Sequence, residues 1–479
     1  MIAFRPRNVA RASLAGLLAL TACAVGPDYQ APTTTLVPFH NAMSVRARNP
    51  AVAPPLDTWW TAFKDATLEA LIRHALAENL DLAASFARVQ QARSAAQGAG
   101  AQLLPTVDAN AQGSALSQSL NSPLGRLARA FPGYNRDQQL YDVGAAASWE
   151  IDIAGGLRRG KEAADAAAQA AQAELTGVRI TVAADVADAY FQVRRDQARI
   201  ATVQQQIEVD SHLLALVRQL RQRGLGDERQ VSQAEAVLAQ AQSALPPLRI
   251  ELEGQLNRLD VLLGAQPGTC AVSLARPSDI PALPAIPDTD TPTDFLRRRP
   301  DIIAAERQLA ASNARIGQAL SDYYPKLSIS GLLGFDSLSA DHLFTAASFQ
   351  PVATGALRWR IFDFGKIDAE LGQARGANAE ALARYRQTVL RAAEDVEDAF
   401  KTLVELEART AQLNTEVQSL QRSLDLSQQA FAAGSIPLTD VLDADRQLLV
   451  ARDSLMQNRG DAARAAVRSF RALGGGWSE

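Results

Sequence analysis

The chain repeats its own pattern, and this internal duplication constrains the fold more than any single motif. Pro105 and Pro325 each end an Ala-rich segment and stand 220 positions apart in the 479-residue sequence. Beyond them, corresponding residues stand 210 positions apart, as in the pairs Trp149/Trp359, Gly155/Gly365, Gly224/Gly434 and Val231/Val441. The offsets differ because a loop between about 114 and 140 is longer than its counterpart. We therefore predict two structural repeats with the same order of elements.

Each repeat contains two segments in which apolar and polar side chains alternate. The segments cover residues 107–114 and 141–152 in the first repeat, and 327–335 and 353–361 in the second. Segments of about ten residues with this period match tilted transmembrane strands. Trp149 and Trp359 fall near strand ends, where membrane-interface aromatics lie. A soluble amphipathic sheet shows the same alternation, so the pattern alone leaves both interpretations open.

The remaining parts of each repeat predict unusually long helices. Apolar residues recur at spacings of three and four from 157 to about 223 and from 366 to about 433, which indicates coiled-coil rods on the order of 100 Å. Gly224 and Gly434 are suited to end these helices. A return helix starts after a turn of a few residues, so each pair must form an antiparallel hairpin. The Pro-rich stretches 24–55 and 267–300 predict extended connectors.

The N-terminus resembles a bacterial export signal. Three arginines precede a short apolar run at 13–20, and Leu20-Thr21-Ala22-Cys23 resembles a lipobox in which Cys23 becomes the acylated first residue. The alternative is an ordinary secretory signal followed by a chance cysteine. Beyond this segment no run of 18 apolar residues occurs. If Cys23 carries lipid, Cys270 has no partner within the chain, since the sequence holds only two cysteines.

Composition argues against nucleic-acid binding, metal binding and catalysis. The 48 basic and 52 acidic residues give a net charge of −4, without the basic excess of a nucleic-acid binder. The two cysteines and four histidines lie apart, so no metal site is expected. Residues 155–161 read G-x-x-x-x-G-K, but Glu162 stands where a phosphate-binding loop needs Ser or Thr. We therefore expect neither an enzyme nor a bound cofactor, apart from the covalent lipid on Cys23.

Several short motifs, taken in their order along the chain, resemble one family. They are Cys23 with Gly26-Pro27-Asp28-Tyr29, then Trp59-Trp60, then Leu68-Glu69-Ala70-Leu71-Ile72, and finally Asp440-Val441-Leu442-Asp443-Ala444. Together with the duplication, they are similar to the TolC/OprM family of outer-membrane efflux channels, in its lipoprotein, NodT-like branch. The resemblance extends over nearly the whole mature chain.

This resemblance implies a mixed α and β membrane protein with two structural repeats. Four strands from each of three protomers would close a 12-stranded transmembrane β-barrel, continuous with a long periplasmic α-helical coiled-coil barrel. The expected segments are the signal peptide 1–22, the lipidated N-terminal segment 23–66, a helix 67–104, a β-hairpin 105–153, a helical hairpin 154–265, a linker 266–299, a helix 300–324, a β-hairpin 325–363, a helical hairpin 364–474 and a tail 475–479.

The resemblance also places a periplasmic gate at Asp440 and Asp443. In a trimer these residues would form two rings of carboxylates, whose repulsion and attraction for cations affect closure and conductance. Alternatively, acidic residues in the first turns of a helix simply favour its dipole. Some family channels latch the gate through a Tyr and an Arg, where this chain has Phe431 and Ile436. Closure is therefore expected to depend on packing and on the aspartates.

The hairpin turns are the expected contacts for a periplasmic adaptor protein. They consist of Gly224, Leu225, Gly226, Gly434, Ser435 and Ile436. Glycines are needed for turning in any case, which leaves Leu225 and Ile436 as the sharper candidates.

The predicted function is the outer-membrane channel of a tripartite efflux pump. It would be a lipid-anchored homotrimer that extends into the periplasm and serves as a passive exit duct for drugs or other small molecules. An adaptor and an inner-membrane transporter, of RND type by resemblance, would open its periplasmic tip. The alternative is a periplasmic coiled-coil adaptor or scaffold lipoprotein, which explains the helices but not the duplicated strand pairs.

Overall fold

The computed structural model describes residues 24–33, 37–48, 54–287 and 298–477. Cys23 and the export signal lie outside these ranges. The chain divides into two compact units. The strand unit comprises Gln90–Ala170, Glu306–Arg384 and the described residues before 33, and the hairpin unit comprises the described residues of Thr33–Val89, Ala171–Ala305 and Tyr385–Glu479.

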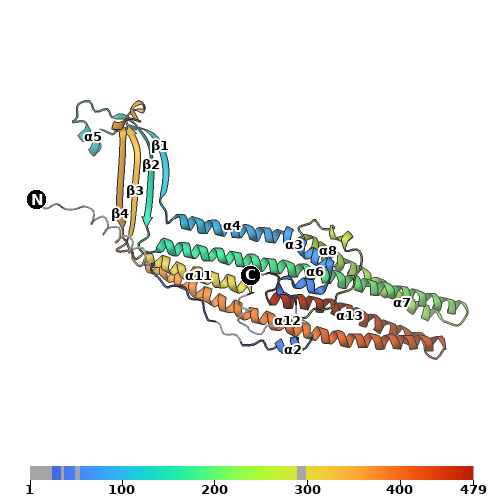
Figure 1. The fold of residues 1–479 in the computed structure, drawn as a ribbon. Coiled ribbons are helices and arrows are strands. Elements are labelled where there is room, and N and C mark those ends of the chain that lie inside the picture. The colour runs from blue at the N-terminus through green and yellow to red at the C-terminus, as the bar shows by residue number, and fades with distance from the viewer. Residues whose placement is uncertain (1–23, 34–36, 49–53, 288–297, 478–479) are drawn as a thin grey trace. The chain divides into compact units, whose positions relative to one another are not determined.

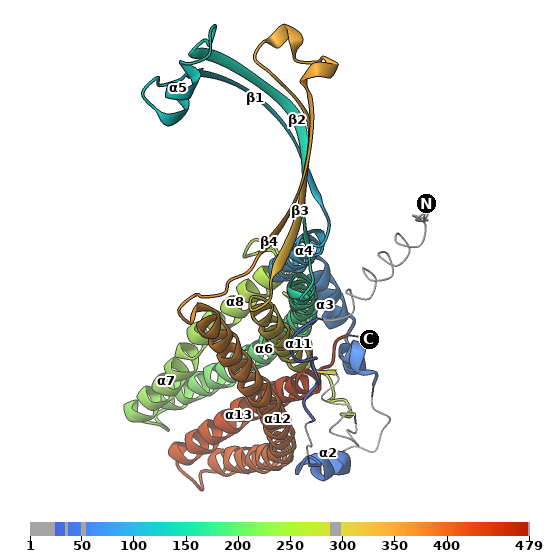
Figure 2. The ribbon, with the colours of Figure 1, turned by 90° about the vertical axis from the view of Figure 1, so that its left-hand side faces the viewer.

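The strand unit contains one antiparallel sheet in the order β1-β2-β3-β4 (Figure 1). The strands are β1 (Thr106–Ser117), β2 (Asp137–Ile151), β3 (Lys326–Ser337) and β4 (Phe349–Arg358). Both edge strands are exposed along their whole length. Figure 2 shows the β1–β2 loop, which carries α5 (Pro123–Ala128), and the β3–β4 loop at the same end of the sheet. Each repeat thus contributes one hairpin to the sheet.

At the centre of the sheet, where the two repeats meet, the backbones of β2 and β3 approach each other closely. Gly144 of β2 pairs with Gly334 of β3, and a Cβ on Gly144 would lie 3.0 Å from the Gly334 Cα. Glycine at both positions allows this close backbone approach. The expected second strand of repeat 2 extended to 361, whereas β4 ends at Arg358. Trp359 and Ile361 therefore follow the strand instead of lying on it.

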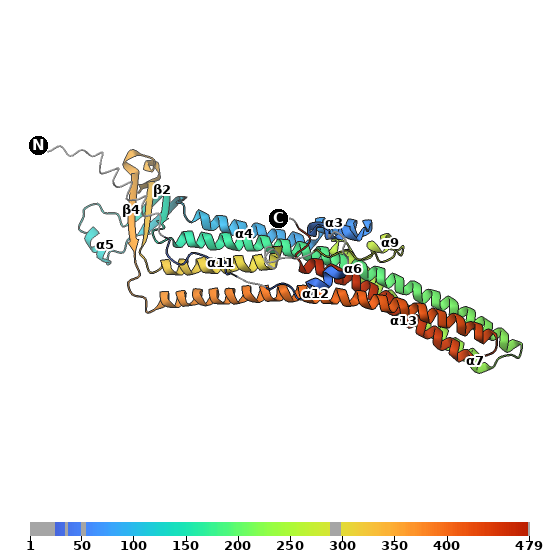
Figure 3. The same ribbon diagram turned by 60° about the horizontal axis from the view of Figure 1, so that its bottom comes forward.

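Two long helices dominate the rest of the chain. They are α6 (Gly156–Gln222) and α12 (Lys366–Ala432), each of 67 residues. The return arm of repeat 2 is one helix, α13 (Leu438–Ala472), whereas that of repeat 1 is split into α7 (Glu228–Ser243) and α8 (Leu245–Leu262). The split occurs because Pro246 and Pro247 lack the N–H groups that a continuous helix needs. Figure 3 shows that both hairpins turn at the same end of the hairpin unit.

Corresponding contacts close the two hairpin turns. Leu225 N donates to Leu220 O at 2.9 Å, and Ser435 N donates to Ala430 O, also at 2.9 Å. Gly224 and Gly434 adopt φ of 74° and 71°. This is the Schellman arrangement, which satisfies carbonyl groups left unpaired at a helix end.

The N-terminal part of the chain is less extended than its proline content predicted. Within the stretch 24–55, which was predicted to be extended, it forms α2 (Ala42–Arg48). The 3-10 helix η2 (Leu56–Phe63) follows this stretch. Trp59 of η2 is fully buried and stacks on Phe470 of α13 with ring centroids 5.4 Å apart. The aromatic core of the hairpin unit therefore fastens this segment to the last helix.

The helices that precede the strands also depart in part from expectation. The single helix expected over 67–104 is divided into α3 (Ala66–Glu78) and α4 (Leu80–Ala101). Asn79 causes the break, because its side-chain oxygen accepts from the backbone N of Asp81 at 2.9 Å and caps α4. In the second repeat, α11 (Pro300–Ser321) occupies the matching place. Among the described residues, no helix combines the length and apolar character needed to cross a membrane.

Candidate functional site

The two hairpin turns differ in how far their apolar side chains are exposed. Leu225, at the first turn, is 73% exposed. Ile436, at the second turn, is only half-buried and packs with Phe431 against the side chains of α13. The two residues expected to contact an adaptor therefore differ, since Leu225 is free for a partner and Ile436 already contributes to the local core.

Two apolar clusters lie directly behind the turns. The first apolar cluster joins the hairpins of both repeats and consists of Leu214, Val217, Val231, Ala234, Leu438 and Leu442. The second apolar cluster lies within the second hairpin and consists of Leu424, Val441, Ala444 and Leu448. Phe431 packs against both clusters. Phe431, which was expected to stand in the place of a polar latch residue, therefore lies in apolar packing.

Asp440 and Asp443 lie on the exposed face of α13 near its start. Between and beside them, Val441, Leu442 and Ala444 are buried in the two apolar clusters. The packing of these neighbours fixes the rotation of α13, so both carboxylates must point away from the packed seam. Asp440 is in the first turn, where the helix dipole also favours it.

The sequence analysis did not predict that an arginine side chain lies beside Asp443. Arg446 Nη2 lies 3.2 Å from Asp443 Oδ1. The spacing of three residues on one helix was the available signal. Both side chains are more than half exposed, so the ion pair is weak and leaves the acidic character of this face largely intact.

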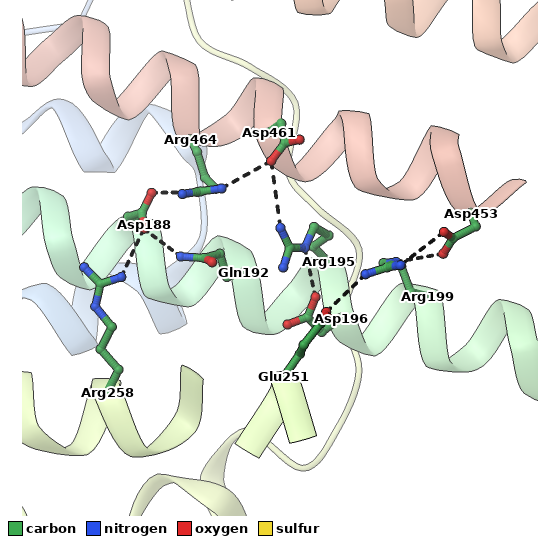
Figure 4. Close-up of polar contacts among 10 residues, drawn as sticks. All are labelled: Asp188, Gln192, Arg195, Asp196, Arg199, Glu251, Arg258, Asp453, Asp461 and Arg464. Carbon is green, nitrogen blue, oxygen red and sulfur yellow. Dashed lines mark hydrogen bonds and ion pairs between the residues drawn. The ribbon is translucent and has the colours of Figure 1, made fainter. Parts of the chain in front are cut away.

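A network of charged side chains, here called the ion-pair belt, joins α6 to α8 and α13 (Figure 4). Its members are Asp188, Arg195, Asp196 and Arg199 of α6, Glu251 and Arg258 of α8, and Asp453, Asp461 and Arg464 of α13. The belt lies further from the turns than the apolar clusters, as the residue numbers along α6 and α13 require. Charged residues that interrupt the apolar seam of α6 were the sequence signal for it.

Within the belt, Asp188 contacts side chains of both α13 and α8. Arg464 Nε donates to its Oδ1 at 2.6 Å, and Gln192 Nε2 donates to its Oδ2 at 2.7 Å. Arg258 Nη1 approaches the same Oδ2 at 3.5 Å. One carboxylate of α6 thus holds both the return arm of its own repeat and the last helix of the other repeat.

Two further belt contacts strengthen the same connection. Arg199 donates to both carboxylate oxygens of Asp453, at 2.7 and 3.1 Å, and reaches Glu251 at 3.2 Å. Asp196 is fully buried, and this burial raises its pKa, while Arg195 at 2.8 Å opposes the rise. The belt therefore connects α6 to α8 and α13 at several points along its length.

The two tryptophans expected at the membrane interface make the same contact in each repeat. Trp149 Nε1 donates to the carbonyl oxygen of Leu103 at 2.9 Å, and Trp359 Nε1 donates to that of Tyr323 at 2.9 Å. Both rings remain exposed, by 38% and 55%. Each indole thus ties the end of its hairpin to the turn that precedes the first strand while leaving its apolar surface uncovered.

The segment after Cys23 contacts α6 and α11 within the strand unit. Arg159 Nη2 donates to Asp28 Oδ1 at 2.7 Å, and Tyr29 donates to Glu306 at 3.1 Å. A Cβ on Gly26, whose φ is 101°, would lie 2.5 Å from the Gly317 Cα. Gly26, Asp28 and Tyr29 therefore all contact residues of α6 or α11.

Comparison with known proteins matches both repeats of the chain. The family model described as "Outer membrane efflux protein" matches residues 71–265 and again 291–475. The pyoverdine export outer membrane protein OpmQ of Pseudomonas aeruginosa is 32% identical over 427 residues, which cover 89% of this chain and 88% of that protein. The toluene efflux pump outer membrane protein TtgI of Pseudomonas putida is 30% identical over 469 residues, which cover 96% of this chain and 97% of that protein.

One solved structure has the same fold, and its sequence identity to this chain is similar to that of these two relatives. The structure of the outer-membrane channel OprN has a TM-score of 0.86 at 33% sequence identity, and the match covers 95% of this chain and 100% of that chain.

Proposed function

Because this chain belongs to the outer membrane efflux protein family and is an outer-membrane channel component of a tripartite efflux pump, we propose that its hairpin tips form the periplasmic gate of that channel. Family membership excludes the alternative of a periplasmic scaffold. It also gives the architecture: a trimer in which four strands from each protomer contribute to a transmembrane barrel, continuous with a helical barrel in the periplasm. The unpaired edges of β1 and β4 are then joined between protomers.

The observation that carries the gate proposal is the orientation of Asp440 and Asp443. Both carboxylates are exposed while the residues between them are buried, so packing holds them on one outward face of α13. In a trimer, three such faces bring six carboxylates together. Their mutual repulsion favours separation of the tips, and their charge favours cations over anions in the constriction.

Apolar packing supplies the opposing force. Phe431 and Ile436 occupy the places of a polar latch and pack beside the first turns of α13. The gate of this chain is therefore held by buried apolar surface, which a partner protein can release by offering replacement contacts.

We further propose that a periplasmic adaptor binds at the hairpin turns and that an inner-membrane transporter of RND type supplies the energy. The strong exposure of Leu225 supports it as an anchor for the adaptor. The channel itself would act as a passive duct and catalyse no reaction, in keeping with relatives that are channel proteins. OpmQ is named for pyoverdine and TtgI for toluene, which are chemically unlike, so we assign the choice of cargo to the transporter.

The anchoring proposal is that Cys23 carries a covalent lipid. The fastening of Asp28 and Tyr29 to the strand unit supports it, because these contacts hold the chain only a few residues from Cys23. The intact mass of the purified mature protein decides the matter: acylation at Cys23 is expected, and a chain cleaved elsewhere without added lipid would contradict it.

Single-channel conductance in planar bilayers tests the gate. The double variant Asp440→Ala, Asp443→Ala is expected to lose cation preference and to change conductance relative to the unmodified protein. Asp425→Ala, which removes an exposed acid from α12 near the same tip, is the matched control and should behave like the unmodified channel. If both variants leave conductance and ion preference unchanged, the gate lies elsewhere, while the channel function stands.

A further inference from the structure

A buried pair of carboxyl groups joins the two repeats between the ion-pair belt and the first apolar cluster. Asp210 of α6 is 2% exposed and Asp445 of α13 is 3% exposed. Gln206 of α6 lies between them, and its Nε2 donates to Asp210 Oδ1 at 2.9 Å and also to Asp445 Oδ2. One amide group therefore satisfies one oxygen of each carboxyl group.

The other two oxygens lack a donor. Asp210 Oδ2 and Asp445 Oδ1 are buried and accept no hydrogen bond. Two ionised carboxylates in contact in such a place would repel strongly and would leave these oxygens unsatisfied. A single proton held between the two carboxyl groups removes one charge and supplies the missing hydrogen bond.

Burial and the closeness of the two carboxyl groups favour this protonated state. Burial, followed by the neighbouring Asp210, raises the pKa of Asp445 to about 7. Burial also raises the pKa of Asp210. Arg452, further along α13, acts in the opposite direction on Asp445, but its guanidinium also binds Gln421 of α12.

The pair is peculiar to one seam of the molecule. Under the 210-residue offset, Asp210 corresponds to Leu420 and Asp445 corresponds to Glu235. Glu235 is exposed and forms an ordinary ion pair with Arg218 at 2.7 Å. The duplication therefore did not create the carboxyl pair twice, and within the described part of the chain the pair lies in the seam between α6 and α13.

We propose that Asp210, Gln206 and Asp445 form a proton-operated latch that holds α6 against α13 when the pair carries its proton and loosens this seam when the proton is lost. The consequence for opening rests on the proposed gate, because Asp443 lies on the same stretch of α13. The first apolar cluster lies next to the latch on the side of the hairpin tips. When the latch opens, this cluster loses the helix contact that holds α6 and α13 together beside it. Acidic conditions thus favour closed tips, and neutral or alkaline conditions ease their separation.

The direction of the pH effect on the stability of the seam follows from the raised pKa of Asp445. A carboxyl group whose pKa is higher in the folded seam than in the separated one stabilises the seam fully below its ordinary pKa of 3.8. This stabilisation declines as the pH rises and is lost once the pH passes about 7. The opening equilibrium of the seam is expected to rise with pH by at most about tenfold per pH unit, which is the limit for the release of one proton.

Infrared difference spectroscopy of the purified trimer tests the proton directly. We expect a carbonyl band of a protonated, buried carboxylic acid that disappears with a midpoint near pH 7 and is absent in Asp445→Asn. Asp210→Asn serves as a second variant should the first fail to fold. Glu208→Gln, which removes an exposed acid from the same helix, should retain the band. A trimer without this band, or a band that persists in both Asn variants, would overturn the latch.

Hydrogen exchange across the seam tests the mechanical consequence. After correction for intrinsic exchange rates, amides of residues 203–217 and 438–452 should lose protection as the pH rises in the unmodified trimer. Asp445→Asn should make protection independent of pH, because its amide donates to Asp210 without a proton from solvent. Protection that does not vary with pH in the unmodified trimer would refute the latch. Neither measurement depends on conductance, so the proposed gate stands or falls separately.

Discussion

The indole Nε1 of Trp149 donates a hydrogen bond of 2.9 Å to the backbone carbonyl oxygen of Leu103. Trp359 makes the same bond with Tyr323 in the second repeat, so the duplication extends to a single contact between a strand end and the preceding turn. The exposed faces of both rings suit an interfacial position in a membrane protein, because an indole combines an apolar body with one polar group.

Replacement of either tryptophan by phenylalanine should cost little stability, and the two costs should be similar. Trp149→Phe and Trp359→Phe each keep an aromatic ring and remove one donor, so we expect a loss of about 1 kcal/mol in the free energy of unfolding. Urea titration followed by far-ultraviolet circular dichroism measures it. A large loss in only one variant would show that the contacts are not equivalent.

Gly460→Ala should destabilise the protein. A Cβ at this position of α13 would lie 2.8 Å from the Cβ and Cγ of Arg195, and displacement of Arg195 removes the partner of the buried Asp196. We expect a loss of about 1 to 3 kcal/mol in the free energy of unfolding. Gly254→Ala in α8 is the matched control, because its Cβ would meet nothing within 4 Å and should stabilise the helix by about 0.5 to 1 kcal/mol. Equal effects of the two substitutions would contradict the steric argument.

Asp188→Asn should weaken the ion-pair belt. Loss of the carboxylate charge weakens the bonds from Arg464 and Arg258, and we expect a cost of about 1.5 to 3 kcal/mol in the free energy of unfolding. The double variant Asp188→Asn, Arg464→Gln should lose less stability than the sum of the two single losses, because both substitutions remove the same contact between Asp188 and Arg464. Lys401→Gln breaks an exposed pair with Glu405 and should cost about 0.5 kcal/mol or less. Additive costs for Asp188 and Arg464 would disprove their coupling.

Leu225→Asp and Ile436→Asp should act on different properties. Leu225 is exposed, so its substitution should leave the melting temperature unchanged and lower the affinity for the cognate adaptor about tenfold or more. Ile436 packs against the second apolar cluster, so its substitution should lower the melting temperature and disturb channel closure. Calorimetry and surface binding of the purified adaptor separate these effects. Unchanged adaptor binding by the Leu225 variant would move the contact away from this turn.

Much of the fold could be predicted because its signals are local and occur twice. The ends of α6 and α12 follow from apolar spacing and from Gly224 and Gly434, and the strand pairs follow from alternation. The breaks at Asn79 and before Pro246 were missed because propensity over a long window outweighed single residues. The short β4 was missed because alternation continues past the last ladder hydrogen bond, to Ile361.

The amino-acid sequence by itself determined the number of repeats, the order of their elements and the acidic face at Asp440 and Asp443, because hydrophobic period, turn chemistry and helical spacing are properties of neighbouring residues. Only the tertiary structure decided that Asp210 meets Asp445, that Asp188 joins two return arms, and that Phe431 fills a place between two clusters. These relationships join helices far apart along the chain, and side-chain burial and partners there depend on how the helices pack rather than on any local pattern.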